Sequence, residues 1–295
     1  MYQFDTIKQY NEFNNHPTLH SLVSVIDFSK AKERTRTKMY MGLYCIALKQ
    51  VKCGDLRYGN SYYDYEEGTL VFFAPGQILQ NEPEGELYQP AGLCLVFHPD
   101  LIKGTILAKH FHEYSFFSYQ ANEGLHLSEK ERVVILDCFD KINAELQQNI
   151  DKHSRKLIVS NIELLLNYCT RFYDRQFITR ETVNIGIMER FETSLNRYFF
   201  DTNLRTNGLP SVAHFANELS LSSNYFGDLI RKETGKSAQE YIHLKLIDVA
   251  KEKIFDNTKS ISEIAYDLGF QYPQYFTRLF KQKTGFTPNE FRNLN

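Results

Sequence analysis

The last ninety or so residues contain one sequence pattern twice, with the copies about fifty residues apart. Each copy has the signals of a short helix, a tight turn and a second helix. Beyond a one-residue difference in the turn, the copies align without a gap, so that Tyr225-Phe226 matches Tyr275-Phe276 and Thr234-Gly235 matches Thr284-Gly285. Two copies are too few for a solenoid, so the pattern predicts a pair of similar modules that act together.

The second copy marks the ends of both its helices. Ser260 and Glu263 have the spacing of a capping box, and Gly269 ends the first helix. Pro273 suits the first position of the next helix, where its missing backbone N–H is not needed. That helix is predicted to bury large apolar residues at helical spacing, namely Phe276, Leu279 and Phe280. Its opposite face collects polar side chains in one stripe, namely Gln274, Thr277, Arg278 and Lys281.

The chemistry of this stripe suits a groove of double-stranded DNA. An arginine can bind guanine and a glutamine can bind adenine through two hydrogen bonds each, while lysine and threonine reach phosphates. In the first copy, the second helix is predicted to be capped by Ser222 and to carry a similar but less basic polar face. Its outward residues are Ser223, Asn224, Asp228 and Arg231. A solvated helix surface explains one such face, but two in tandem favour a reader of adjacent major-groove segments.

The run from Ser262 to Phe291, SEIAYDLGFQYPQYFTRLFKQKTGFTPNEF, resembles the signature of AraC/XylS-type transcription regulators. The resemblance is strong from about Leu209 to Asn295 and implies a helical DNA-binding domain in which bases are read by Gln274, Thr277 and Arg278. The first copy departs from the family, because Gly227 and Asp228 stand where many members have a basic or amide side chain. Asp228 can still accept a hydrogen bond from a cytosine amino group.

The first 125 residues contain short aromatic and aliphatic runs separated by turn residues, one of them from Leu56 to Tyr65. This rhythm predicts an antiparallel barrel or sandwich, and the family resemblance implies a cupin-like β-barrel. Several side chains can line a barrel and stack against a small ligand, namely Tyr44, Tyr58, Tyr63, Tyr65, Phe72 and His98. Ordinary barrel core is the alternative. His110 and His112 alternate as chelating residues would, but no further ligand has suitable spacing, so no metal or cofactor is predicted.

Residues 126–206 predict two helices with apolar seams, the first of them capped by Ser128 and Glu131. Such seams bury against each other or against a second subunit, and the family resemblance implies a dimer through this region. A basic cluster of Arg171, Arg175 and Arg180 is predicted to contact an acidic helix surface or phosphate. A hinge is predicted at Asn207–Pro210, before the DNA-binding domain.

Composition adds few constraints. The formal net charge is −2, so we expect modest non-specific affinity for DNA and a dependence on locally placed cations, on dimerisation, or on both. The cysteines have no paired short spacing, which predicts buried thiols rather than disulfides or a zinc site: Cys45, Cys53, Cys94, Cys138 and Cys169. With neither a long apolar run nor an apolar leader, the chain is expected to be cytoplasmic and not bound to a membrane.

The sequence thus predicts an α+β chain with a cupin-like barrel in residues 1–125, a helical dimerisation segment in 126–206 and two helix-turn-helix units in 207–295. The predicted function is sequence-specific regulation of transcription, controlled by an effector through the N-terminal domain, and not catalysis. The predicted partners are promoter DNA, a second copy of the chain, RNA polymerase and a small-molecule effector. The alternatives are a cupin-type binding protein or enzyme with a helical appendage, and a purely structural interaction protein.

Overall fold

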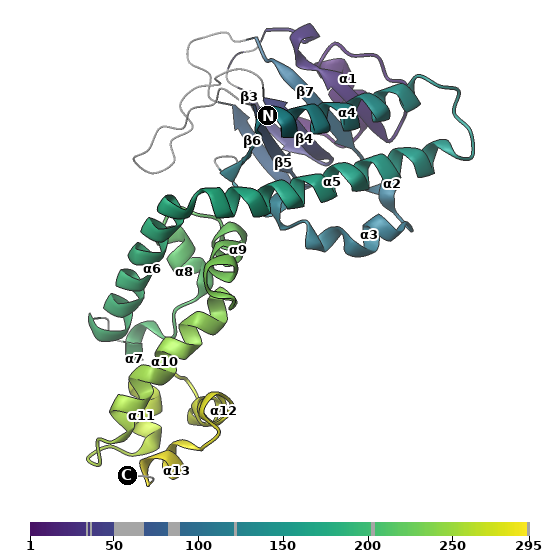
Figure 1. Cartoon of the computed structure of the whole chain (residues 1–295). Helices are drawn as coiled ribbons and strands as arrows, with labels where there is room; N and C mark the ends of the chain where they lie inside the picture. Colours follow the sequence, from purple (N-terminus) through teal and green to yellow (C-terminus); the bar gives the residue numbers. More distant parts are fainter. Residues whose placement is uncertain are drawn as a thin grey trace. The chain divides into compact units, whose positions relative to one another are not determined.

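The computed structural model describes residues 1–33, 35, 37–49, 68–81, 89–120, 123–201 and 204–293. Contacts divide the chain into two compact units, Met1–Thr179 and Arg180–Asn295. The first unit combines sheets and helices, and the described part of the second is helical (Figure 1), which confirms the predicted α+β class. Within these ranges, no helix has both the length and the apolar character needed to cross a membrane.

The strands of the first unit form two sheets. The smaller has the order β1-β3-β6, from Tyr2–Phe4, Thr37–Met41 and Gln77–Asn81. The larger has the order β2-β7-β4-β5-β8, from Val23–Asp27, Gly92–Phe97, Tyr44–Lys49, Thr69–Phe73 and Leu125–His126. Neighbouring strands are antiparallel except β1 and β3. In the described ranges the strands therefore do not close into the predicted barrel, and the strand predicted from Leu56 to Tyr65 lies outside them.

The main core of this unit lies on one face of the larger sheet. Cys45, Ala47 and Val71 belong to it, together with residues of the smaller sheet such as Met41. Because side chains alternate along a strand, the residues between them project from the opposite face. Helix α1 (Ile7–Phe13) begins at a capping box and places Ile7 in the same core.

Short helical segments follow the strands of the larger sheet. They are η1 (Phe28–Lys30), α2 (Pro99–Ile102), α3 (Ile106–His110), η2 (Phe111–Glu113) and η3 (Ser115–Ser118). The aromatic side chains of η2 and η3 contact the face of the larger sheet that points away from the main core: Phe111 and Phe117 pack on Tyr44, and Phe116 and Phe117 on Phe72. This segment therefore covers part of the second apolar face of that sheet.

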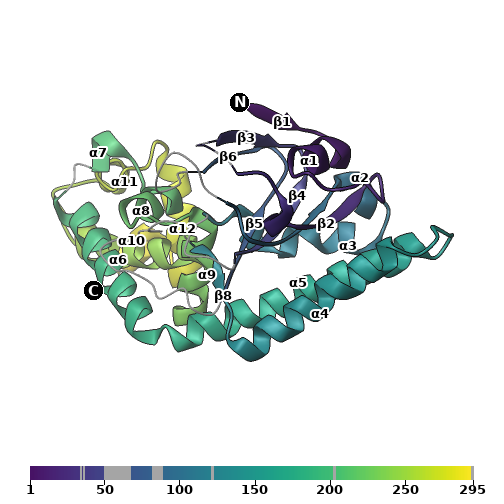
Figure 2. The ribbon, with the colours of Figure 1, turned by 90° about the horizontal axis from the view of Figure 1, so that it is seen from above.

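Two long helices complete the first unit. Helices α4 (Glu129–Leu146) and α5 (Ser154–Thr179) lie side by side and antiparallel (Figures 1 and 2). The capping box of Ser128 and Glu131 is formed at the start of α4. The apolar seam of each helix is buried, and it consists of Ile135, Phe139, Ile142 and Leu146 on α4, and of Ile158, Ile162, Leu165, Cys169 and Phe172 on α5. The two seams therefore bury within the chain.

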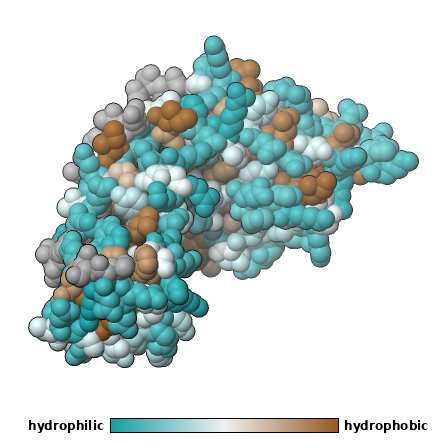
Figure 3. Space-filling view, turned by 60° about the horizontal axis from the view of Figure 1, so that its bottom comes forward, coloured by the Kyte–Doolittle hydropathy of each residue, from teal (hydrophilic) through white to brown (hydrophobic). Residues whose placement is uncertain are grey.

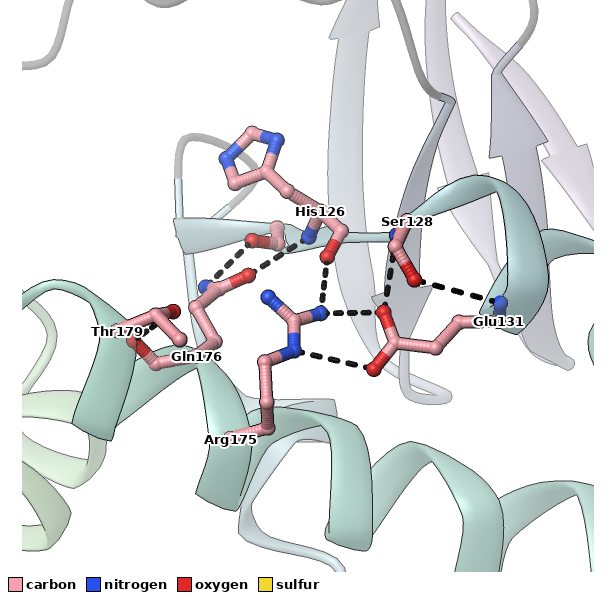
Figure 4. Close-up of polar contacts among 7 residues, drawn as sticks. His126, Ser128, Glu131, Arg175, Gln176 and Thr179 are labelled. Atoms are coloured by element: carbon pink, nitrogen blue, oxygen red, sulfur yellow. Dashed lines mark hydrogen bonds and ion pairs between the residues drawn. The ribbon is translucent and has the colours of Figure 1, made fainter.

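The end of α5 is fastened to the free edge of β8 (Figure 4). Arg175 donates to both carboxylate oxygens of Glu131 at 3.0 and 2.6 Å, and to the His126 carbonyl at 2.7 Å. Gln176 accepts the His126 N–H at 2.7 Å and donates to the Gly124 carbonyl at 3.2 Å. These side chains satisfy backbone groups that an edge strand would otherwise expose. Within the predicted basic cluster, Arg175 thus contacts an acidic helix surface, that of α4.

Replacing Arg175 by alanine is expected to lower the free energy of unfolding of the first unit by about 2 kcal/mol. The reason is that Glu131, whose side chain is 14% exposed, would lose its charged partner. Urea unfolding followed by circular dichroism measures the change. Arg132→Ala is the matched control, since its bidentate pair with Glu129 is more exposed and contributes at most about 0.5 kcal/mol. Equal small losses in both variants would contradict the prediction.

The second unit contains helices α6 to α13. Their bounds are Glu181–Asp201, Leu204–Asn207, Val212–Glu218, Ser223–Thr234, Ala238–Ile254, Ile261–Asp267, Pro273–Thr284 and Pro288–Arg292. Several predicted signals lie where they are needed: Ser260 and Glu263 form the capping box of α11, and Pro273 begins α12. Gly235 and Gly285 end α9 and α12 in the left-handed conformation, at φ 71° and 84°. The two copies thus fold as similar pairs of helices, α8–α9 and α11–α12.

Helix α6 packs on the first of these pairs. The fully buried ring of Phe191 meets Phe215 of α8 and Phe226 of α9 edge-on, with centroids 5.3 and 5.0 Å apart. Polar contacts extend the same interface, since Asn184 donates to Glu233 at 3.0 Å and the Tyr241 hydroxyl donates to Glu192 at 2.7 Å. Helix α6 therefore contributes to the core of the second unit.

Candidate nucleic-acid interface

Each helix-turn-helix buries one face of its second helix. On α9 the buried residues are Tyr225, Phe226, Leu229 and Ile230, and on α12 they are Phe276 and Phe280. The predicted core residue Leu279 is only half buried. The first helix of each pair contributes buried residues of its own, Phe215 and Ala216 on α8 and Ile264 and Ala265 on α11. This packing leaves the opposite faces of α9 and α12 to solvent.

The outward face of α12 carries the predicted polar stripe. Gln274, Arg278 and Lys281 are exposed, and Thr277 is half buried. The Thr277 hydroxyl donates to the Pro273 carbonyl at 3.2 Å, so its proton is held within the helix. The guanidinium carbon of Arg278 lies 5.5 Å from the centroid of the Tyr275 ring. An amide, a guanidinium and an ammonium group are therefore presented together.

The outward face of α9 is chemically different. Ser223, Asn224 and Arg231 are exposed, and Asp228 is half buried. Ser222 accepts the backbone N–H of Tyr225 at 3.1 Å, which makes it the N-cap of the helix. The face thus places an acidic and a basic group near each other, where α12 has only basic ones.

Helix α10 joins the two pairs and contacts α9, α11 and α12. In Figures 1 and 2, α9 and α12 lie on the same side of α10. Ser237 caps α10 by accepting the Glu240 N–H at 3.2 Å, while the Glu240 carboxylate accepts a hydrogen bond from Lys283 of α12 at 2.8 Å. That hydrogen bond lowers the pKa of Glu240. Glu240, three residues after the cap residue Ser237, therefore ties α12 to α10 and helps to set the spacing of the two pairs.

The structure describes three of the six candidate ligand residues of the first unit. Tyr58, Tyr63 and Tyr65 lie outside the described residues. Tyr44 and Phe72 lie on the face away from the main core, and their rings are 5.3 and 5.5 Å from that of Phe117. His98 lies at the start of α2, where its Nδ1 accepts the Asp100 N–H at 3.1 Å. The structure thus brings two of the three described candidates together, as part of a packed aromatic layer.

The other candidate residues have local partners. His110 is paired with Glu113 at 2.9 Å, and His112 Nδ1 lies 3.1 Å from the Lys109 carbonyl oxygen. In the described ranges, no three His, Cys, Asp or Glu side chains are grouped so as to hold a metal ion. The described cysteines are buried and form no disulfide, namely Cys45, Cys94, Cys138 and Cys169, while Cys53 lies outside the described residues.

The aromatic residues at the start of α12 are the feature of this surface that the sequence analysis missed. Tyr272 and Tyr275 are 53% and 51% exposed, and their ring centroids are 5.7 Å apart. The repeat alignment pairs Tyr275 with Tyr225, which is only 2% exposed. Alignment alone therefore suggests a buried ring. The sequence feature that could have indicated an exposed Tyr275 is its spacing of three residues from Arg278, which places both side chains on one side of the helix.

Known proteins resemble parts of this chain. A model described as a helix-turn-helix domain matches residues 215–294. The uncharacterized transcriptional regulatory protein YesN of Bacillus subtilis strain 168 is 38% identical over 76 residues, which are 25% of this chain and 21% of YesN. The uncharacterized HTH-type transcriptional regulator YfiF of the same strain is 28% identical over 180 residues, which are 61% of this chain and 54% of YfiF.

A third relative is named as an activator. The HTH-type transcriptional activator RhaR of Escherichia coli O1:K1 / APEC is 30% identical over 81 residues, which are 28% of this chain and 29% of RhaR. The chain therefore spans less than two thirds of the length of each of these three curated relatives.

Proposed function

Because its C-terminal segment belongs to the AraC-type helix-turn-helix domains, we propose that the chain is a transcription regulator that binds specific sequences in double-stranded DNA. The observation that carries the proposal is the tandem arrangement of the two pairs. Both second helices, α9 and α12, bury an apolar face and expose a polar one, on the same side of α10. A single amphipathic helix needs no function, but two of them repeated in this arrangement suit a protein that binds adjacent segments of the major groove, one turn of DNA apart.

The dimensions of the connector support this reading. Helix α10 has 17 residues. At a rise of 1.5 Å per residue it is about 25 Å long. Successive major grooves on one side of DNA are about 34 Å apart. A rod of this length, with one recognition helix near each end, allows α9 and α12 to enter two successive grooves if the DNA bends modestly.

Helices α12 and α9 contribute unequally to DNA binding. On α12, Arg278 and Gln274 read bases, because their side chains make the bidentate contacts that distinguish guanine and adenine. Lys281 and the partly engaged Thr277 contact the backbone. On α9 the contacts come from Ser222, Ser223, Asn224, Asp228 and Arg231, of which Asp228 accepts from a cytosine amino group. The acidic group on α9 favours α12 as the stronger contributor to affinity, since DNA binding is dominated by phosphate attraction.

The first unit is assigned the regulatory role, as a cupin-like domain that binds a small effector in the cytoplasm. Helices α4 and α5 form the proposed dimer contact, with RNA polymerase as a further partner. Leu157 and Leu164, which are 48% and 40% exposed, lie one heptad apart on α5 and support such a contact. The face shown in Figure 3 has scattered hydrophobic patches among hydrophilic residues.

Selection from a random duplex pool by the purified full-length chain tests the main proposal. The expected result is enrichment of two half-sites about one helical turn apart, with binding that weakens steeply as salt rises. A salt titration of the selected duplex against a scrambled one then separates specific from non-specific affinity. Absence of any enriched sequence, with the full chain and with residues 180–295 alone, would refute the regulator proposal.

Arg278→Ala is expected to weaken binding to the selected duplex by about 1–3 kcal/mol and to relax the preference at one base pair, because a bidentate contact to guanine is lost. Fluorescence anisotropy on the selected duplex and on its single-base variants measures both effects. Lys281→Ala is the control, since loss of a phosphate contact weakens all duplexes equally and lowers the salt slope by about one. If Arg278→Ala also acts equally on every duplex, Arg278 is a phosphate contact.

A further inference from the structure

Tyr275 occupies an unusual place for the second aromatic residue of the repeat. Its ring is 51% exposed, and its neighbours include the Tyr272 ring, at 5.7 Å and 80°, and the guanidinium of Arg278, at 5.5 Å. The tyrosine and the arginine are three residues apart, so they lie on the same side of α12. Within the described residues, no ion pair holds the Arg278 guanidinium. Its contact with the Tyr275 ring is therefore the interaction that can restrict it.

The first copy shows that this arrangement is not required by the fold. Its matching tyrosine, Tyr225, is buried at 2% exposure, and the position that matches Arg278 holds Asp228. The helix-turn-helix is thus formed equally well with the tyrosine inside. An exposed tyrosine ring and an arginine three residues later occur together on α12, and α9 has neither. The exposure of Tyr275 therefore correlates with the presence of Arg278 and not with the packing of the core.

We propose that Tyr275 is a positioning residue that holds Arg278 in the orientation from which it reads a base. The inference rests on the proposed function and assigns a specificity determinant within it. An exposed arginine samples many rotamers and loses that freedom when its planar group grips guanine. The face of an aromatic ring attracts a guanidinium and restricts it before DNA arrives, so less freedom is lost on binding. Tyr275 therefore acts on base discrimination through Arg278.

A double-mutant cycle in the full-length chain tests this. The probe is the duplex selected from the random pool, compared with the same duplex changed at the base pair whose preference Arg278→Ala relaxes. Tyr275→Leu, which keeps apolar bulk and removes the ring, is expected to lower the discrimination between the two duplexes by about two- to fivefold. Tyr275→Phe keeps the ring and is expected to retain the discrimination. In the Arg278→Ala background, Tyr275→Leu should have no further effect.

A second measurement needs no DNA. In nuclear magnetic resonance spectra of the free protein, the Arg278 side-chain protons should be shifted by the ring current of Tyr275 and of Tyr275→Phe, and should return to ordinary values in Tyr275→Leu. Ordinary Arg278 shifts in the unsubstituted chain would overturn the positioning role. So would an effect of Tyr275→Leu that is the same on both duplexes and persists in Arg278→Ala, because Tyr275 would then contact DNA itself. Failure to select any duplex would instead overturn the regulator proposal on which the inference rests.

Discussion

Replacing Phe191 by alanine is expected to lower the free energy of unfolding of the second unit by about 3–5 kcal/mol. The side chain is fully buried on α6, and its ring packs against Phe215, Phe226 and Tyr241, so the substitution leaves a cavity between four helices, α6, α8, α9 and α10. Because α8 and α9 form the first helix-turn-helix, the loss should also weaken DNA binding at temperatures near the new midpoint. Thermal and urea unfolding of residues 180–295 measure the change.

Phe286→Ala is the matched control for Phe191→Ala. It removes the same atoms from a side chain that is 43% exposed, and its backbone hydrogen bond to Thr284 is unaffected. We expect the control to lose less than half as much stability as Phe191→Ala, since the cost scales with the area buried and the cavity left. Similar losses in the two variants would show that α6 is not part of the core. A fragment of residues 207–295, which lacks α6, should then be as stable as residues 180–295.

The helix-turn-helix pairs could be predicted from sequence because their signals are local. A capping box at Ser260, a proline at the start of α12 and a glycine in the left-handed conformation at its end each act within one turn of helix. The burial of Phe276 and Phe280 on α12 follows from their 3.6-residue spacing, whereas Leu279, predicted by the same spacing, is only half buried. The hydrogen bond from Lys283 to the Glu240 carboxylate has no such local signal, because the two residues are 43 positions apart in the sequence. A contact at that separation cannot be read from a cap pattern.

The role of α6 could not be predicted in the same way. The sequence predicts only two helices in residues 126–206, and these are α4 and α5, so α6 itself is not predicted. Its buried residues Phe191, Leu195 and Phe199 recur every four residues, but this spacing does not say which element covers them. The covering residue Phe226 lies in a segment that is predicted separately, beyond the apparent hinge at residues 207–210. Assignment to the second unit depends on packing between distant segments, for which one sequence carries no signal.

The sequence also could not predict which face of the larger sheet lies in the main core. Strand β4 is apolar on both faces: Cys45 and Ala47 lie in the main core, while Tyr44 and Ile46 project from the other side. Because both sides are covered, the alternation of polar and apolar residues that would identify the interior is missing. Tyr44 and Phe72 were therefore proposed as ligand-binding residues on composition alone, and the structure places them beside Phe117 in a packed layer.

Replacing Gly269 by alanine is expected to destabilise the second unit by about 2–5 kcal/mol, through two separate effects. The residue has φ 86°, which costs an alanine about 1–2 kcal/mol. In addition, a Cβ at this position would lie 2.9 Å from the Leu204 carbonyl oxygen and 2.9 Å from the Gly208 carbonyl carbon. Both are backbone atoms, so no flexible side chain can move aside, and α11 would have to separate from α7.

Gly285→Ala isolates the first of these effects. Gly285 has nearly the same φ, 84°, but its added Cβ would meet nothing within 4 Å. The control should therefore lose only about 1–2 kcal/mol of stability, from the strained backbone conformation. The difference between the two variants measures how closely the α11–α12 turn approaches α7 and Gly208. Equal losses in urea unfolding of residues 180–295 would mean that this approach is not tight. A larger loss in Gly269→Ala would show that α7 and the turn after it support the second helix-turn-helix, and hence the placement of α12.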